Sequence, residues 1–161
     1  MTKSQASNKV TAGLIMAFLI GATGLMWDRS GHAEDLPKVP PEYAGKKMPA
    51  GWWTNPKVIA AGQKIYEGRV AFKKELEKDH KKCFQCHGVD GKPKIRRARD
   101  FRAAAKMNTF SDAYWFWRVS EGVPNTKMET WKDYLTEEQI WQVITYEHTF
   151  SHDGKPAEHR H

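Results

Sequence analysis

The motif Cys83-Phe84-Gln85-Cys86-His87 contains both cysteines of this 161-residue chain. A Cys-x-x-Cys-His run is typical of the covalent attachment of a c-type haem. Each thiol adds across one vinyl group of the haem, and two intervening residues let the sulfurs reach neighbouring corners of the ring. The histidine that follows the second cysteine is then placed as a ligand of the iron. We therefore predict one haem c, attached through Cys83 and Cys86 and ligated by His87.

Two other uses of the motif are alternatives. A structural zinc site needs four ligands, and the chain has no second cysteine pair, although His80 and His87 could contribute. A redox-active dithiol is expected beside a βαβ pattern, and no segment has a convincing strand pattern. A disulfide framework would need more cysteines, spread along the chain. Haem attachment is the interpretation that these observations favour.

Upstream of the motif, the sequence predicts a helix that starts at Pro56 with Asn55 as its cap. Apolar residues follow at helical spacing as far as Tyr66. The segment 72–82 mixes basic and acidic side chains, and we interpret it as a solvated continuation of this helix.

Two more helices are expected downstream. One runs from Ser111, as a possible cap, to Val119 and contains several aromatic residues. The last starts at Thr136, with Gln139 at the capping-box position, and continues to about residue 150. No repeats occur, and no segment has a convincing strand pattern, so the sequence predicts an all-α domain.

The two ends of the chain differ from its middle. Lys3 and Lys9 precede an apolar run over 10–26, and small residues at 31 and 33 suit a signal peptidase, so residues 1–33 are expected to be an export signal. An uncleaved membrane anchor is the alternative. Residues 34–55 are rich in proline and predict an extended N-terminal arm lying on the haem domain, which spans 56–150. The polar tail, 151–161, is expected to fray.

The charge of the chain favours some partners over others. The formal net charge is +7. Removing residues 1–33, with three basic side chains and one acidic, would leave +5. Such a surface can dock to an acidic redox protein. Nucleic acid is not expected as a partner of an exported chain, and contact with a membrane is expected only if the N-terminal segment is uncleaved.

From Pro56 to Phe150 the sequence resembles the class I cytochrome c family. The resemblance rests on a helix with Gly62 and Tyr66, on the Cys83–Gly88 run, and on a methionine loop before a final aromatic helix. It implies an all-α fold of three to four helices around one covalently bound haem. The family's first and last helices touch at a glycine, so we expect Gly62 to contact Tyr146 or Trp141.

The resemblance also implies Met128 as the second iron ligand, since the family's methionine lies in a loop before the last helix. A His/Met pair fills both axial positions and suits electron transfer. Met107 is a rival, although packing in an Ala-rich helical stretch explains it better. His148 and His152 are candidates for bis-histidine ligation.

Two positions depart from the family. Glu129 stands where a proline commonly follows the methionine, and no proline lies within 97–100, where a carbonyl should accept the N–H of the proximal histidine. The basic residues between 88 and 100 can pair with haem propionates or face an acidic partner; they are Lys92, Lys94, Arg96, Arg97 and Arg99.

The sequence thus predicts a periplasmic cytochrome that passes single electrons between respiratory redox partners and is not itself an enzyme. Two alternatives remain. One is a subunit of a larger respiratory oxidoreductase, which exposed Trp52 and Trp53 would favour. The other is a haem enzyme or gas sensor with an open iron position.

Overall fold

Helices α1 (Pro56–Tyr66) and α5 (Glu137–Thr149) cross in close contact at Gly62 in the computed structural model, which describes residues 36–78 and 80–159. A Cβ atom at Gly62 would lie 2.0 Å from the carbonyl oxygen of Gln142 and 2.9 Å from Cβ of Tyr146. Only glycine allows this approach. The contact expected with Tyr146 is confirmed, whereas Trp141 faces another helix.

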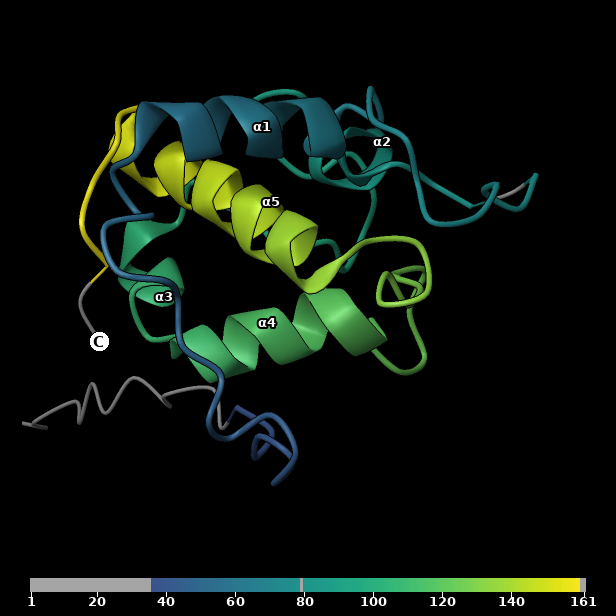
Figure 1. Cartoon of the computed structure of the whole chain (residues 1–161), viewed down its shortest axis with the longest axis horizontal. Helices are drawn as coiled ribbons and strands as arrows, with labels where there is room; N and C mark the ends of the chain where they lie inside the picture. Colours follow the sequence, from purple (N-terminus) through teal and green to yellow (C-terminus); the bar gives the residue numbers. More distant parts are fainter. Residues whose placement is uncertain (1–35, 79, 160–161) are drawn as a thin grey trace, which may run out of the picture. The chain divides into compact units, whose positions relative to one another are not determined.

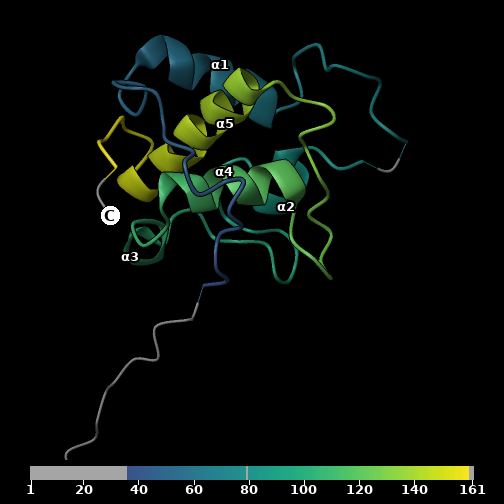
Figure 2. The same ribbon diagram turned by 60° about the horizontal axis from the view of Figure 1, so that its bottom comes forward.

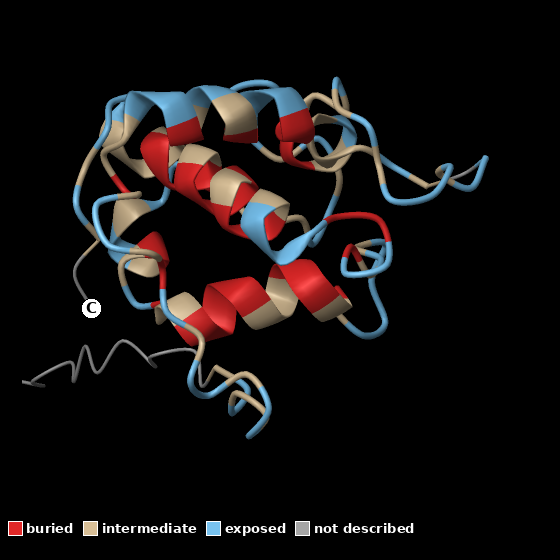
Figure 3. Cartoon of the chain, viewed as in Figure 1, coloured by how far each residue is buried: buried red, intermediate tan, exposed pale blue. Residues whose placement is uncertain are grey.

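That other helix is α4 (Asp112–Glu121), whose Phe116 lies 4.5 Å from Trp141, measured between ring centroids. Figures 1 and 2 show α5 between α1 and α4. Figure 3 shows that the buried positions of α1 lie on its side toward α5, while its outer side is exposed. Burial of these apolar faces is the main force that holds the three helices together.

The helix starts that the sequence predicts are confirmed. Oδ1 of Asn55 accepts a 2.9 Å hydrogen bond from the N–H of Lys57, and Ser111 caps α4. Thr136 and Gln139 form a reciprocal capping box at the start of α5. These side chains satisfy N–H groups that a helix leaves without partners in its first turn.

Three short elements complete the all-α fold: α2 (Cys83–His87), α3 (Ala104–Met107) and the 3-10 helix η1 (Phe150–His152). No strand occurs within residues 36–78 and 80–159. None of the helices in these ranges is long and apolar enough to span a membrane. The predicted export signal, residues 1–33, lies outside the described residues.

The helical continuation expected over 72–82 is wrong. The described part of this segment is irregular and runs beside the chain after the Met128 loop, where the N–H of Lys73 donates to the carbonyl of Tyr134 over 2.8 Å. Phe72 packs near Trp131, with ring centroids 6.1 Å apart. The charged pattern has no apolar stripe that a helix could bury, so tertiary contacts with 131–134 decide its course.

Residues 37–55 of the arm pack on the haem domain. Tyr43 donates a hydrogen bond to Glu121, and the N–H of Met48 donates to Asp112 over 2.9 Å. Trp53 is buried, with 7% of its surface exposed, while Trp52 is half-buried. Trp53 therefore belongs to the core of this domain and is not a free surface for a partner.

The tail is docked rather than frayed as far as His159. One imidazole nitrogen of His159 lies 2.6 Å from the carbonyl oxygen of Phe110, and the other lies 3.2 Å from Nε2 of His148. The ring of Trp53 lies 4.8 Å from the His159 ring. His159, in the polar tail, thus packs against aromatic residues of the core. The local sequence does not predict this contact.

Candidate haem site

The Cys-x-x-Cys-His motif forms helix α2, which is five residues long. The side chain of Gln85 closes the first turn, because its Oε1 accepts a 2.7 Å hydrogen bond from the N–H of Lys82. The helix ends at Gly88, which has φ of 81° and whose N–H donates to Phe84 over 3.0 Å. A Cβ atom at Gly88 would lie 2.1 Å from the carbonyl oxygen of Lys92, so the turn requires glycine.

The imidazole of His87 is held in one orientation. Its Nδ1 lies 3.1 Å from the carbonyl oxygen of Arg99, and Phe101 stacks on the ring at 4.4 Å with a 12° angle between planes. Only 7% of His87 is exposed, and burial lowers its pKa. The ring is therefore neutral at pH 7, with Nδ1–H donating to Arg99 and Nε2 left as a metal ligand. Arg99 supplies the carbonyl that the sequence left unidentified.

Met128 lies in the loop between α4 and α5, which reverses at Gly122. The N–H of Val123 donates to the carbonyl of Met128 over 2.9 Å, and the N–H of Met128 donates to Oγ1 of Thr126 over 3.0 Å. These two hydrogen bonds close the loop on itself and place Met128 at the cavity described next.

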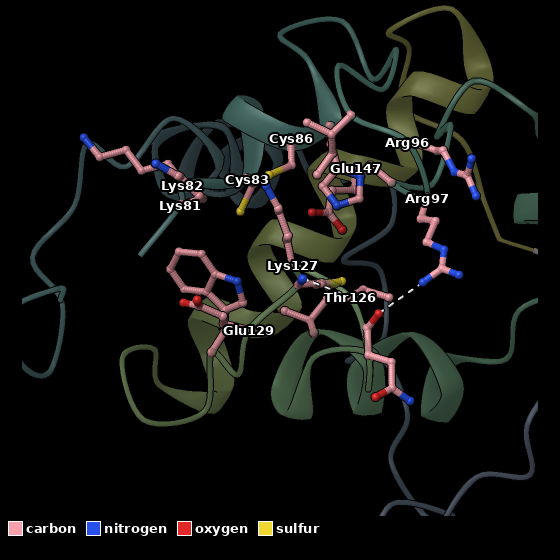
Figure 4. A pocket seen from close by; sticks show the side chains of 17 residues that line it. Lys81, Lys82, Cys83, Cys86, Arg96, Arg97, Thr126, Lys127, Glu129 and Glu147 are labelled. Atoms are coloured by element: carbon pink, nitrogen blue, oxygen red, sulfur yellow. Dashed lines mark hydrogen bonds between the residues drawn. The ribbon is translucent and has the colours of Figure 1, made fainter. Parts of the chain in front are cut away.

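One cavity of about 530 Å³ is lined by Cys83, Cys86, His87 and Met128. Figure 4 shows the two cysteines on its wall. This volume lies in the range of about 300–1,000 Å³ that is usual for cofactor pockets. Its wall combines apolar, basic and acidic side chains. Besides these four residues, it is lined by Lys81, Lys82, Ile95, Arg96, Arg97, Ala98, Val119, Asn125, Thr126, Lys127, Glu129, Trp131 and Glu147.

The rival ligands lie elsewhere. Met107 is fully buried in the core, and neither it nor His148 nor His152 lines the cavity. His80 does not line the cavity, although its partner Glu129 does. Among residues 36–78 and 80–159, no three His, Cys, Asp or Glu side chains are grouped so as to hold a metal ion. The zinc alternative and the bis-histidine alternative therefore have no geometric support in the described part of the chain.

The residues of the cavity fit a c-type haem. Cys83 and Cys86 are free thiols, and burial raises the pKa of Cys83, with the nearby Glu147 adding to the effect. A neutral imidazole, an intermediate donor, and a thioether, a soft donor, both suit haem iron. Of the five basic residues singled out in the sequence, Arg96 and Arg97 line the cavity, whereas Lys92, Lys94 and Arg99 do not.

Sequence reasoning missed one residue of this site. Glu147 is 4% exposed, lines the cavity from α5 and is hydrogen-bonded to Trp115, while its Oε2 has no hydrogen-bond partner among the described residues. Burial raises its pKa to about 8. A glutamate in an amphipathic helix is expected on the solvent side, so no local signal marked it.

The sequence of the haem domain matches a family of known proteins. The family model described as cytochrome c oxidase, cbb3-type, subunit III matches residues 57–146, more than half of the chain. No curated protein matches significantly. Among solved structures, a chain of the reducing HAO-like protein complex of Kuenenia stuttgartiensis is similar, with 20% identity and a TM-score of 0.44. The match covers 60% of this chain and 44% of the Kuenenia stuttgartiensis chain, which is less than half of the length of the latter.

Proposed function

Because the chain belongs to the family of cytochrome c oxidase, cbb3-type, subunit III, a family of c-type cytochrome domains, we propose that it binds one haem c and transfers single electrons in the periplasm. Cys83 and Cys86 would attach the haem covalently, and His87 and Met128 would be its axial ligands. The observation that supports this most is that the four residues, from α2 and from a loop more than thirty positions later, line one cavity.

The haem, when bound, supplies an iron that changes oxidation state by one electron. The chain's own residues orient the ligands and exclude water. Arg99 and Phe101 hold the His87 ring in place, and the neutral ring would bind the iron through the lone pair of Nε2. Trp131, which is 5% exposed, excludes water from the cavity wall beside the Met128 loop. A fixed ligand set and a dry wall reduce the rearrangement that accompanies a change of iron charge.

Basic side chains at the cavity support docking to an acidic redox partner; they are Lys81, Lys82, Arg96, Arg97 and Lys127. Such charges raise association rates more than they raise affinity. The partners would be respiratory proteins. The predicted export signal and the extracytoplasmic attachment of c-type haem support the periplasmic location.

A subunit of a larger oxidoreductase is the second candidate, because the matching family is described as an oxidase subunit. The burial of Trp53 against the haem domain favours a separate carrier, since that side chain is not available for a partner.

The absorption spectrum of the purified ferric protein tests the proposal. We expect a weak long-wavelength band from methionine sulfur to iron, and we expect Met128→Ala to abolish it. Met107→Ala is the control and should keep the band. A native protein without the band would remove Met128 as a ligand and turn attention to an open iron position. Haem that is released by denaturation in acid would contradict covalent attachment.

A further inference from the structure

A close contact joins the segment that precedes the haem motif to the methionine loop. Nδ1 of His80 lies 2.8 Å from Oε2 of Glu129. His80 precedes Cys83 by three residues, and Glu129 directly follows Met128. The pair therefore connects the segment that enters the haem motif with the loop that presents the proposed second ligand.

The imidazole of His80 is fixed on its own side. Its side chain is only 3% exposed, and the ring meets Trp131 edge-on at 4.6 Å and Tyr134 at 4.4 Å, measured between ring centroids. The segment before His80 is tied to the same place, because Tyr134 donates to Glu77 over 3.1 Å and accepts at its carbonyl from the N–H of Lys73. His80 is thus a rigid anchor rather than a mobile surface histidine.

Glu129 is the movable member of the pair. Its side chain is 55% exposed, yet one carboxylate oxygen turns toward the buried imidazole. A hydrogen bond to a carboxylate is stronger than one between neutral groups. The contact therefore restrains the backbone of the residue next to Met128 without burying the whole glutamate.

Glu129 directly follows Met128, so a restraint on Glu129 also restrains the proposed ligand. The class I cytochromes that the sequence resembles commonly have proline there, and proline restricts the backbone by fixing φ. Here the side chain of Glu129 supplies a restraint through His80. The hydrogen bonds of Val123 and Thr126 hold Met128 from the preceding side. On the following side, His80 contacts Glu129, and Thr130 and Trp131 donate to the carbonyl of Ser120 over 2.7 and 3.0 Å.

We propose that His80 is a positioning residue, which donates a hydrogen bond to Glu129 across their 2.8 Å contact and thereby holds the Met128 loop closed over the haem cavity. This inference rests on the proposed function, because it takes Met128 as the iron ligand. When the pair is broken, the loop opens more often and Met128 leaves the iron more easily. An added ligand that competes for the same position then binds more tightly.

The experiment measures the affinity of added imidazole for the ferric holoprotein. We expect His80→Ala and Glu129→Ala each to bind imidazole about tenfold more tightly than the native protein, a change of about 1.4 kcal/mol. His80→Gln can still donate to Glu129 and is expected to return most of the native affinity. Glu129 is exposed enough that its variants test the pair even if a His80 variant folds poorly.

The double variant His80→Ala/Glu129→Ala separates a direct contact from two independent effects. If the residues act through their hydrogen bond, the double variant binds imidazole no more tightly than either single variant. Glu137→Gln is the matched control: it breaks a 2.6 Å ion pair with Lys46, on the arm, and should leave the affinity unchanged.

Two results would overturn the inference while the methionine band of the native protein stands: single variants with native affinity, or a double variant whose effect is the product of the single effects. His80→Gln that behaves as His80→Ala would also count against the hydrogen bond, because both remove the ring but only one removes the donor. Absence of the methionine band from the native protein would overturn the Met128 assignment itself, and this inference with it.

Discussion

The hydroxyl group of Tyr66 donates a 2.7 Å hydrogen bond to the carbonyl oxygen of Gly88, in the buried interior of the domain. Tyr66 is the last residue of α1, and Gly88 directly follows the proposed ligand His87. The ring of Tyr66 packs edge-on against Tyr146 of α5 at 5.3 Å. One side chain thus connects the helix crossing to the end of the haem motif.

We expect Tyr66→Phe to lower the free energy of unfolding by about 1–2 kcal/mol, because it leaves the buried carbonyl of Gly88 without its donor. The haem and the His87 ligand should remain. Denaturant unfolding of the holoprotein gives the stability, and the absorption spectrum checks the haem. An unchanged midpoint would mean that water or another donor replaces the hydroxyl.

Gly62→Ala is expected to destabilise the domain by about 3 kcal/mol, the upper part of the usual cost of overpacking. The new methyl group would lie 2.0 Å from the backbone oxygen of Gln142, and backbone cannot turn away as a flexible side chain can. Gly45→Ala is the matched control, because a Cβ atom there meets nothing within 4 Å. Thermal unfolding compares the two. Equal losses would show that α1 and α5 can separate without cost.

His148 predicts a loss of stability in acid. Burial lowers its pKa to about 3, and the neighbouring His159 and His152 add to the effect. Below pH 6.5 the unfolded chain binds a proton that the folded chain does not, so stability falls as the pH decreases from 6.5 toward 3 and is unaffected by this group above 6.5. The full effect is about 5 kcal/mol.

His148→Phe tests this linkage, because it keeps an aromatic ring against Trp53 and removes the titrating group. Denaturant unfolding at a series of pH values should show a flatter dependence between pH 3 and 6.5 than in the native protein. Parallel curves for the two proteins would assign the acid sensitivity to other groups.

Glu147 predicts a reduction potential that depends on pH. Burial raises its pKa to about 8, so it is neutral at pH 7 and becomes negative as the pH rises above 8. A negative charge at the cavity favours the ferric iron, which has one more positive charge than the ferrous iron. The potential should therefore fall with rising pH, by an amount on the order of tens of millivolts.

Glu147→Gln keeps the shape and loses the charge, so its potential should remain level across this range and exceed the native potential at pH 9. Potentiometric titration at several pH values measures both. A native potential that is independent of pH, or a Gln variant with the native slope, would show that Glu147 does not change its charge there.

Much of the fold followed from local patterns. The caps at Asn55, Ser111 and Thr136 lie within three residues of the N–H groups that they satisfy, and such short-range pairs can be recognised in the sequence. The prediction for the segment 72–82 was wrong because it, too, used only the local pattern. Its charged pattern is compatible with a solvated helix, and only its contact with the distant 131–134 chain excludes one.

The candidate site was predictable in part. The spacing of the motif identifies Cys83, Cys86 and His87, and these three residues line the cavity together with Met128. The assignment of Met128 as a ligand stays a prediction. Glu147 could not be found, because a buried glutamate has the same helical spacing as an exposed one, and only the packing of α5 determines which it is.

The sequence by itself determined that this chain is an all-α c-type cytochrome domain, because the Cys-x-x-Cys-His run is typical of c-type haem and the helix signals act over one or two turns. The tertiary structure alone decided that the Arg99 carbonyl orients His87, that Glu147 is buried in the cavity, and that His80 meets Glu129. These relationships depend on how loops without periodicity fold over the helices. Their partners are far apart in the chain, so no local pattern specifies them.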